Sequence, residues 1–262
     1  MIVQELWSEL SQSLFEPKEF EVSFGSREGL PPISIPNNQI KAILRGFVDR
    51  VDTWERNGCT YFRVVDYKTG KKDFDYCDVF NGVGLQMLLY MYALKHNGED
   101  LLGANPVIAG VQYFPARVPF LSADGRVDNA EAENERKSKW KRKGLLLSDQ
   151  EILSAMEPDE TSGRLCCKIK KDGTLSGDVA DREQLLLLER YIFHYLAGMV
   201  DEIVSGNVEP NPYTRGSSHD ACSFCPYGTI CHKETVEGRR NYKTMSAVKF
   251  WEEIGKEMAC ND

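Results

Sequence analysis

Two stretches rich in β-branched and aromatic residues constrain most strongly the fold that this sequence can adopt. Residues 40–54 read IKAILRGFVDRVDTW, and residues 59–69 read CTYFRVVDYKT. Between them lies ERNG, and an Asn-Gly pair flanked by such runs is a strong hairpin signal because both residues tolerate positive φ. The pattern predicts a β-hairpin over residues 40–69, inside a larger sheet. Gly70 is expected to end it.

Hydrophobic periodicity predicts helices around this hairpin. Residues 2–14 have helical spacing, with a stripe made of Ile2, Leu6, Trp7, Leu10 and Leu14. Further helices are expected at about 84–97, 147–156, 181–205 and 246–258, and strands at 20–24 and 107–114. In the long helix the expected buried stripe is Leu188, Ile192, Tyr195, Leu196, Met199 and Ile203. The order of elements predicts an α/β fold with helices on the faces of a sheet.

Composition and charge exclude several classes of protein. The chain has 262 residues, 42% hydrophobic and 27% charged, so it has ample apolar material for a core. No run approaches the ~20 apolar residues of a membrane span, and the start lacks the pattern of a signal peptide. A cytoplasmic setting is therefore expected. The net charge of −8 disfavours nucleic-acid binding by bulk electrostatics but leaves room for a local basic channel.

One segment is strongly basic. Residues 136–143 read RKSKWKRK, with six basic residues in eight. They belong to a polar stretch, 116–143, that has no periodicity and is expected to be a mobile loop. The basic run is then either a solvated loop or a row of phosphate contacts, with Trp140 as a stacking platform for a base.

Three residues of the hairpin carry the chemistry. Asp66 and Lys68 are two apart on one strand and share a face, while Asp49 on the neighbouring strand can reach the same face. Two converging carboxylates repel unless a cation lies between them, and oxygen ligands favour Mg²⁺ or Mn²⁺. Such an ion can activate water and polarise a phosphodiester, and the lysine can stabilise the charge that develops.

The alternative for these three residues is a surface ion pair, because an isolated D-x-K triplet is common. Val64 and Val65 argue against it, since an acid at the end of a buried apolar strand needs a reason. The sequence therefore favours a hard-metal site that hydrolyses a nucleic-acid backbone.

Three of the eight cysteines crowd together as Cys222-x2-Cys225-x5-Cys231. A disulfide framework is not expected in a chain of this size with no export signal. From spacing alone, the favoured interpretation is a zinc site completed by His219 or His232.

The motifs G-x-x-D and V-V-D-Y-K-T-G, followed by Gln86-x-x-x-Tyr90, resemble the RecB-type branch of the PD-(D/E)xK nuclease superfamily. The resemblance implies a central mixed sheet flanked by helices and a metal-dependent deoxyribonuclease. Asp49 and Asp66 would bind Mg²⁺ or Mn²⁺, with Lys68 assisting catalysis. Gln86 and Tyr90 would position DNA, although spacing alone fits Tyr90 equally well as a core aromatic. No histidine precedes His96, so the upstream histidine of this branch is expected to be absent or cut away.

The cysteine cluster, with FDYCDVFNGVGLQMLLYMYAL and NYKTMSAVKFWEEI, resembles the AddB family of helicase–nuclease subunits. This implies that residues 1–262 form a single RecB-like nuclease domain, a C-terminal fragment of a larger subunit, with a cysteine-rich clasp over 211–237. In that family three such cysteines and a fourth, far upstream, hold a 4Fe–4S cluster. No cysteine precedes Cys59 here, so the cluster on Cys222, Cys225 and Cys231 is expected to be absent or incomplete in this chain.

The same resemblance implies hydrolysis of single-stranded DNA, on the 5′-terminated strand, during double-strand break repair with an AddA-type helicase subunit. The chain contains no G-x-x-x-x-G-K-[ST] phosphate loop, so it is not expected to hydrolyse ATP. A Cas4-like iron–sulfur nuclease is disfavoured because its first cysteine would lie near the start of the chain. A non-catalytic DNA-binding scaffold is disfavoured because Asp66 and Lys68 are both present.

Overall fold

The computed structural model describes residues 2–260 except 28, 38, 118–124, 126–127, 160–161, 216–218, 224 and 232–239. The chain forms two compact units. The first, here the sheet unit, comprises Met1–Ser34, Ile43–Phe74 and Gly84–Glu189. The second, the cysteine unit, comprises Ile35–Ala42, Asp75–Val83 and Arg190–Asp262.

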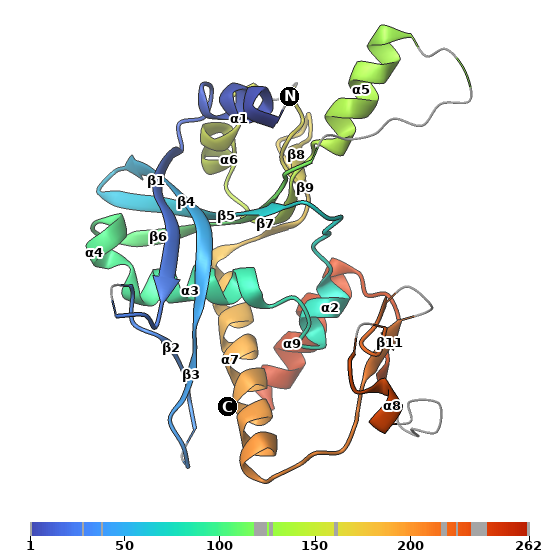
Figure 1. The fold of residues 1–262 in the computed structure, drawn as a ribbon. Coiled ribbons are helices and arrows are strands. Elements are labelled where there is room, and N and C mark those ends of the chain that lie inside the picture. The colour runs from blue at the N-terminus through green and yellow to red at the C-terminus, as the bar shows by residue number, and fades with distance from the viewer. Residues whose placement is uncertain are drawn as a thin grey trace. The chain divides into compact units, whose positions relative to one another are not determined.

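A six-stranded mixed sheet forms the centre of the sheet unit (Figure 1). Its order is β1-β4-β5-β6-β7-β10, in which β5 is parallel to β6 and β7 to β10, while the other neighbours are antiparallel. The strands are β1 (Glu16–Phe24), β4 (Gly46–Arg56), β5 (Cys59–Lys68), β6 (Pro106–Pro115), β7 (Lys143–Leu147) and β10 (Val179–Ala180). The predicted α/β fold with a central mixed sheet is confirmed.

The predicted hairpin is formed by β4 and β5. Its turn lies at Asn57 and Gly58, whose φ angles are 51° and 75°, as a two-residue turn with two positive φ values requires. The strands pair from Arg56 with Cys59 to Arg50 with Val65. The hairpin is shorter than predicted, because β3 (Ala42–Leu44) pairs with β2 (Ile33–Ile35) in a separate two-stranded sheet.

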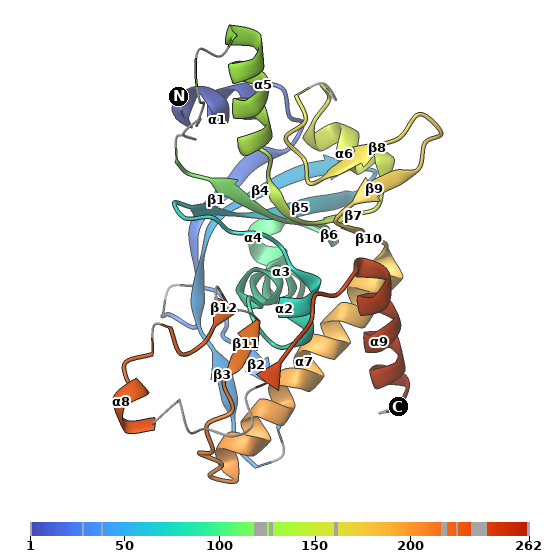
Figure 2. The same ribbon diagram turned by 90° about the vertical axis from the view of Figure 1, so that its right-hand side faces the viewer.

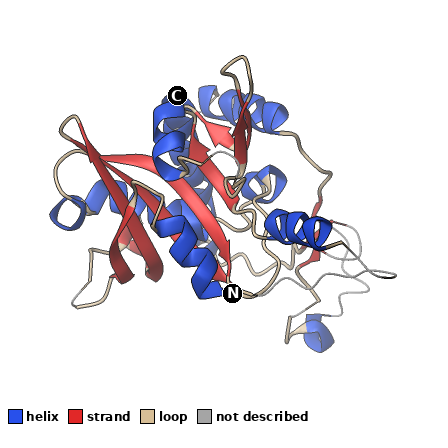
Figure 3. Ribbon diagram, turned by 90° about the horizontal axis from the view of Figure 1, so that it is seen from above, coloured by secondary structure: helices blue, strands red, loops and turns tan. Residues whose placement is uncertain are grey.

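Helices cover both faces of the sheet. Helix α3 (Gln86–Asn97) lies on one side, while α1 (Ile2–Leu10) and α6 (Gln150–Met156) lie on the other (Figures 1 and 2). Seen from above, the helix beside the N-terminus lies over the strands (Figure 3). Residues 87–94 of α3 are all buried, which makes it a core helix. Short α4 (Glu99–Leu102) leads into β6, and β8 (Cys167–Ile169) pairs with β9 (Leu175–Gly177) as a hairpin.

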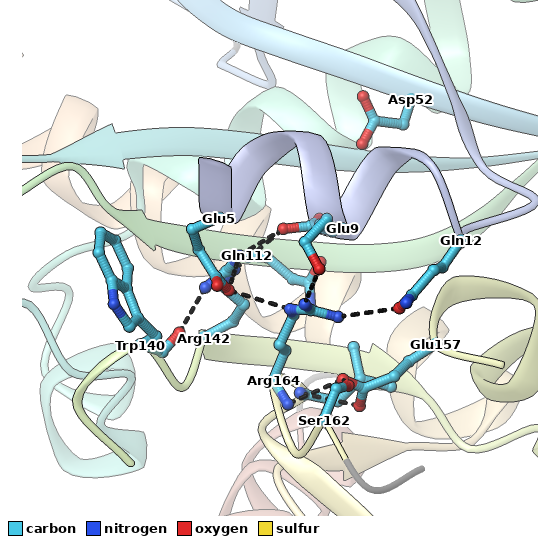
Figure 4. Close-up of polar contacts among 12 residues, drawn as sticks. Glu5, Glu9, Gln12, Asp52, Gln112, Trp140, Arg142, Glu157, Ser162 and Arg164 are labelled. Carbon is cyan, nitrogen blue, oxygen red and sulfur yellow. Dashed lines mark hydrogen bonds and ion pairs between the residues drawn. The ribbon is translucent and has the colours of Figure 1, made fainter. Parts of the chain in front are cut away.

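A buried network of charges joins α1 to the sheet (Figure 4). Arg50 and Arg63, both at most 1% exposed, hold Asp52 through contacts of 2.8 Å. Arg63 Nη2 also donates to Glu9 Oε1 over 2.9 Å, and Arg142 donates to Glu9 Oε2. Buried charges are tolerated when they are paired and hydrogen-bonded in this way. Glu9 therefore anchors α1 to the sheet.

This anchoring corrects the predicted face of the first helix. Trp7 is 74% exposed and Leu14 is also exposed, whereas the buried residue of α1 is Glu9. The prediction is wrong for Trp7 and Leu14, because three arginines from distant segments turn Glu9 toward the sheet. Ile2 and Leu6 of the predicted stripe, in contrast, pack against a buried cluster of Val65, Phe114 and Trp140. In α7 (Arg182–Val204), Leu188 and Ile192 are buried as predicted, but Met199 and Ile203 are exposed.

Part of the stretch predicted as a mobile loop is helical. Residues Asn129–Lys139 form α5, which begins at Asp128, whose side chain accepts a hydrogen bond from the Ala130 amide. Lys139 and Glu135 form an ion pair one turn apart, 2.8 Å long. Capping and this ion pair favour a helix that has no apolar stripe. The rest of the predicted loop lies partly outside the described residues.

The cysteine unit consists of α2 (Tyr76–Phe80), part of α7, α8 (Gly228–Cys231), α9 (Ala247–Ala259) and strands β11 (Tyr213–Arg215), β12 (His219–Asp220) and β13 (Arg240–Asn241). Tyr76 packs on Phe250, with ring centroids 5.2 Å apart, so α2 contacts α9. Arg215 Nη1 donates to Asp75 Oδ2 over 2.8 Å. Among the described helices, none is both long and apolar enough to cross a membrane.

We expect Glu9→Gln to destabilise the chain by about 3–5 kcal/mol at neutral pH, because it removes the negative charge that the buried Arg63 and Arg142 share. Burial alone would raise the pKa of Glu9, but Arg142, Arg63 and Arg50 outweigh it and lower the pKa from 4.5 to about 2. This stabilisation is therefore complete above pH 4.5 and is lost as the pH falls toward 2.

The measurement is urea unfolding between pH 7 and pH 2. The difference between the wild type and Glu9→Gln should shrink as the pH falls. Glu16→Gln, at an exposed position of β1, is the matched control and should change stability by less than about 0.5 kcal/mol. A Glu9→Gln protein as stable as this control would contradict the role of Glu9.

Candidate active site

The structure brings Asp49, Asp66 and Lys68 together on one face of the hairpin. In β4 and β5, continuing the register from Arg50 and Val65 by one residue sets Asp49 opposite Asp66. Lys68 Nζ lies 2.6 Å from Asp66 Oδ2. Asp49 Oδ2 accepts a hydrogen bond from the Tyr67 amide over 2.8 Å, which fixes the second carboxylate beside the strand. The face of the hairpin that carries Arg50 and Arg63 is the opposite one.

Asp66 is held in an environment that disfavours its charge. It is 6% exposed, and burial is the largest cause that raises its pKa. The Lys68 ammonium lowers the pKa again, while the nearby Asp49 carboxylate raises it and Lys72 lowers it. The net result is a pKa above the usual aspartate value. A cation held between the two acids would therefore relieve their repulsion and favour the charged form of Asp66.

Gln86 and Tyr90 meet at the start of α3. Gln86 Nε2 donates to Tyr90 Oη over 2.8 Å, and the Phe47 amide donates to the same oxygen over 3.3 Å. Tyr90 is buried against Phe24, whereas Gln86 is exposed. Gly46 is required here, because a Cβ at that position would lie 2.4 Å from Tyr90 Oη. Tyr90 therefore fixes the beginning of β4, two residues before Asp49.

Lys72 is a residue of this region that the sequence motifs do not indicate. Its ammonium acts on Asp66 and lies 5.8 Å from the centre of the Tyr113 ring. A Cβ at Gly84 would lie 3.3 Å from Lys72 Nζ, so Lys72 is also beside the start of α3. Tyr113 is paired in register with Asp66, and burial together with the Asp66 charge raises its pKa. The pattern K-T-G-K-K after the strand is the signal that could have suggested Lys72.

The three clustered cysteines belong to the cysteine unit. The Cys225 amide donates a hydrogen bond of 3.2 Å to the Cys222 carbonyl. Cys231 ends α8. In the part of the chain that the structure describes, no three His, Cys, Asp or Glu side chains form a group that could hold a metal ion. His232 lies outside the described residues, as does part of the predicted clasp.

The hypothesis that Trp140 is a stacking platform is wrong. Trp140 is 6% exposed and packs on Phe114, with ring centroids 6.1 Å apart. Arg142 of the same basic run is buried in the network with Glu9. Neither side chain is available to a nucleic acid.

Comparison with known proteins agrees with this geometry. A model of the PD-(D/E)XK nuclease superfamily matches residues 2–232. The chain therefore belongs to that superfamily, as its motifs predicted.

Comparison with curated proteins gives a narrower result. The chain is similar to AddB proteins, each named as one subunit of an ATP-dependent helicase/deoxyribonuclease. Identity is 32% over 254 residues with the protein of Clostridium kluyveri, covering 94% of this chain and 22% of the relative. It is 36% over 242 residues with that of Acetivibrio thermocellus, covering 90% and 21%. It is 36% over 245 residues with that of Moorella thermoacetica, covering 91% and 21%.

The chain thus spans about a fifth of the length of these relatives. The predicted resemblance to the AddB family is confirmed.

Proposed function

We propose that this chain hydrolyses phosphodiester bonds of single-stranded DNA with Mg²⁺ or Mn²⁺, using Asp49 and Asp66 as metal ligands. The observation that carries the proposal is the pair of acids on neighbouring strands, one buried and in contact with Lys68. A surface ion pair would not need a buried carboxylate beside a second one. The donor set fits a divalent ion, since both ligands offer carboxylate oxygens and their mutual repulsion favours a bound cation.

When bound, such an ion would supply Lewis acidity toward the phosphodiester and acidify a water molecule. The chain's own residues do the rest. The Tyr67 amide keeps the Asp49 carboxylate oriented through its hydrogen bond. Lys68 is about one third exposed, so its ammonium can turn from Asp66 to the phosphate and stabilise the charge that develops there.

Gln86 and Tyr90 have different tasks in this proposal. Tyr90 is buried and acts as a positioning residue, because its hydroxyl accepts the Phe47 amide at the start of β4. Gln86 is exposed and oriented by the Tyr90 hydroxyl, so its amide is able to contact the DNA strand. Tyr90 is thus a core aromatic residue whose hydroxyl also orients the Gln86 side chain.

The biological setting is proposed from the relatives. These relatives are named as one subunit of an ATP-dependent helicase/deoxyribonuclease. We propose that the chain acts within such a subunit, paired with an AddA-type helicase subunit, on the 5′-terminated strand during double-strand break repair.

We also propose that Cys222, Cys225 and Cys231 bind a 4Fe–4S cluster in the longer subunit. Their spacing and the hydrogen bond between the Cys225 amide and the Cys222 carbonyl support this, but three thiolates do not complete a four-ligand site. The described residues do not by themselves fit the cluster, so the fourth ligand would come from another segment. Zinc, with His219 or His232 as the fourth ligand, is the alternative.

Asp66→Ala is expected to abolish cleavage while the fold remains intact, because it removes a metal ligand and relieves repulsion with Asp49. The measurement is digestion of a labelled single-stranded oligonucleotide with Mg²⁺, together with thermal unfolding. Glu55→Ala, an exposed acid on the same hairpin, is the control and should cleave like the wild type. Near wild-type cleavage by Asp66→Ala would show that the metal site is elsewhere.

Lys68→Ala should lower the rate of cleavage at saturating Mg²⁺ by about 10²–10³-fold, the usual contribution of a positioned electrostatic group. Single-turnover rates over a range of Mg²⁺ concentrations separate this effect from metal affinity. Lys18→Ala, at an exposed position of β1, provides the control. Recovery of the full rate at high Mg²⁺ would instead assign Lys68 to metal binding.

The chain alone is expected to purify with little or no iron, because its three clustered cysteines are one thiolate short of a four-cysteine cluster site, or with zinc, which His219 or His232 would complete. Metal analysis of protein purified without oxygen measures this directly, and Cys225→Ser should remove any metal that is found. A stoichiometric four-iron cluster in the wild-type chain would mean that a residue of this chain supplies the fourth ligand.

A further inference from the structure

A cavity of about 440 Å³ in the sheet unit is lined mainly by cations. Its charged lining consists of Lys68, Lys71, Lys72, Lys139, Lys141, Lys143 and Arg117, with Asp73 as the one acid in that lining. We call it the lysine pocket. Seven positive charges against one negative charge are unusual in a chain whose net charge is −8. A cleft lined by one sign of charge focuses the electric field, so this pocket attracts anions.

The basic run 136–143 builds one side of the pocket. Lys139, Lys141 and Lys143 line it, whereas the residues between them, Trp140 and Arg142, are buried. Lys139 ends α5, Trp140 still has helical backbone angles, and β7 begins at Lys143. The packing of Trp140 on Phe114 and of Arg142 on Glu9 therefore holds the three lysines on the other side of the segment.

The other side of the pocket comes from the segment that follows β5. Lys71 and Lys72 belong to it, and Lys72 lies against the ring of Tyr113, which also lines the pocket. Asp73 connects the two sides, with Oδ2 3.5 Å from Lys71 Nζ and Oδ1 3.3 Å from Lys143 Nζ. A carboxylate thus occupies the place between two lysines that a phosphate would suit.

The pocket is continuous with the candidate active site, because Lys68 belongs to both. Its ammonium contacts Asp66 on one side and lines the pocket on the other. A strand whose cleaved phosphate lies at Lys68 would therefore place its neighbouring phosphates among the remaining lysines.

We propose that the lysine pocket binds the phosphates of single-stranded DNA next to the bond that is cut, and that Asp73 competes with them for Lys71 and Lys143. This inference rests on the proposed nuclease function, and it adds a binding site that the carboxylate motif does not contain. DNA is favoured over an acidic protein segment because the pocket shares Lys68 with the nuclease site. Binding there depends on backbone charge and carries no base specificity.

The test uses the intact chain in EDTA, so that no cleavage occurs, and a fluorescent single-stranded oligonucleotide of about 16 nucleotides. The variant is Lys141→Gln with Lys143→Gln. The matched control is Lys170→Gln with Lys171→Gln, which removes two exposed lysines of the β8–β9 hairpin that do not line the pocket. Thermal unfolding checks that both variants are folded.

Each lost phosphate contact should reduce the slope of log K against log salt by about 0.7, so two contacts weaken binding about 25-fold at 0.1 M salt. The control should keep the wild-type slope and affinity. Asp73→Asn should bind more tightly than the wild type, because the competing carboxylate is gone. These three results together would support the proposal that the lysine pocket binds DNA phosphates.

The proposal would be overturned if the variant with Lys141→Gln and Lys143→Gln bound DNA as tightly as the control variant. It would also be overturned if Asp73→Asn bound DNA more weakly than the wild type. A polyglutamate peptide of equal charge that displaces the oligonucleotide from the wild type at equal concentration would overturn it as well, since the pocket would then suit acidic segments in general. Cleavage with Mg²⁺ is measured separately. If the lysine variant binds DNA more weakly but the wild-type chain does not cleave DNA with Mg²⁺, the proposed binding site stands. The proposed nuclease function is then refuted.

Discussion

The candidate active site depends on a buried network of arginines and carboxylates on the opposite face of the hairpin. Arg50 and Arg63 come from the two hairpin strands and share Asp52, and Glu9 joins them from α1. Because strand residues alternate, the same two strands present Asp49 and Asp66 on the opposite face. A slip of one residue would move the site acids into the network and the arginines out of it. The network therefore fixes the register on which the candidate site depends.

The network also reaches the site through the backbone. Arg50 Nη1 donates to Tyr67 Oη over 2.5 Å, and the Tyr67 amide donates to Asp49 Oδ2. The Tyr67 ring thus contacts the network on one face of the hairpin, and the Tyr67 amide contacts the Asp49 carboxylate of the candidate site. This connection explains how a charged core on one side can keep a pair of repelling acids in place on the other.

The parts of the fold and site that could be predicted from the sequence are those set by local chemistry. Asn57-Gly58 predicted the turn because of its positive φ angles, and the spacing of Asp66 and Lys68 predicted a shared face because strands have a period of two. Glu9 could not be predicted, because its partner Arg142 is 133 residues away in the chain. The prediction for Trp140 is wrong for a related reason: its charged neighbours suggest exposure, but Trp140 packs on Phe114 of β6 and is buried.

The basic run illustrates how one short segment can serve both the core and the surface. Its even-numbered residues, Trp140 and Arg142, are tied to the sheet and to α1, which directs the odd-numbered lysines toward the pocket. Lysines on a fixed backbone lose less conformational entropy on binding an anion than lysines on a mobile loop do. In the proposed site, the buried Arg142 and Trp140 therefore contribute to anion binding without touching the anion, because they fix the backbone that carries the three lysines.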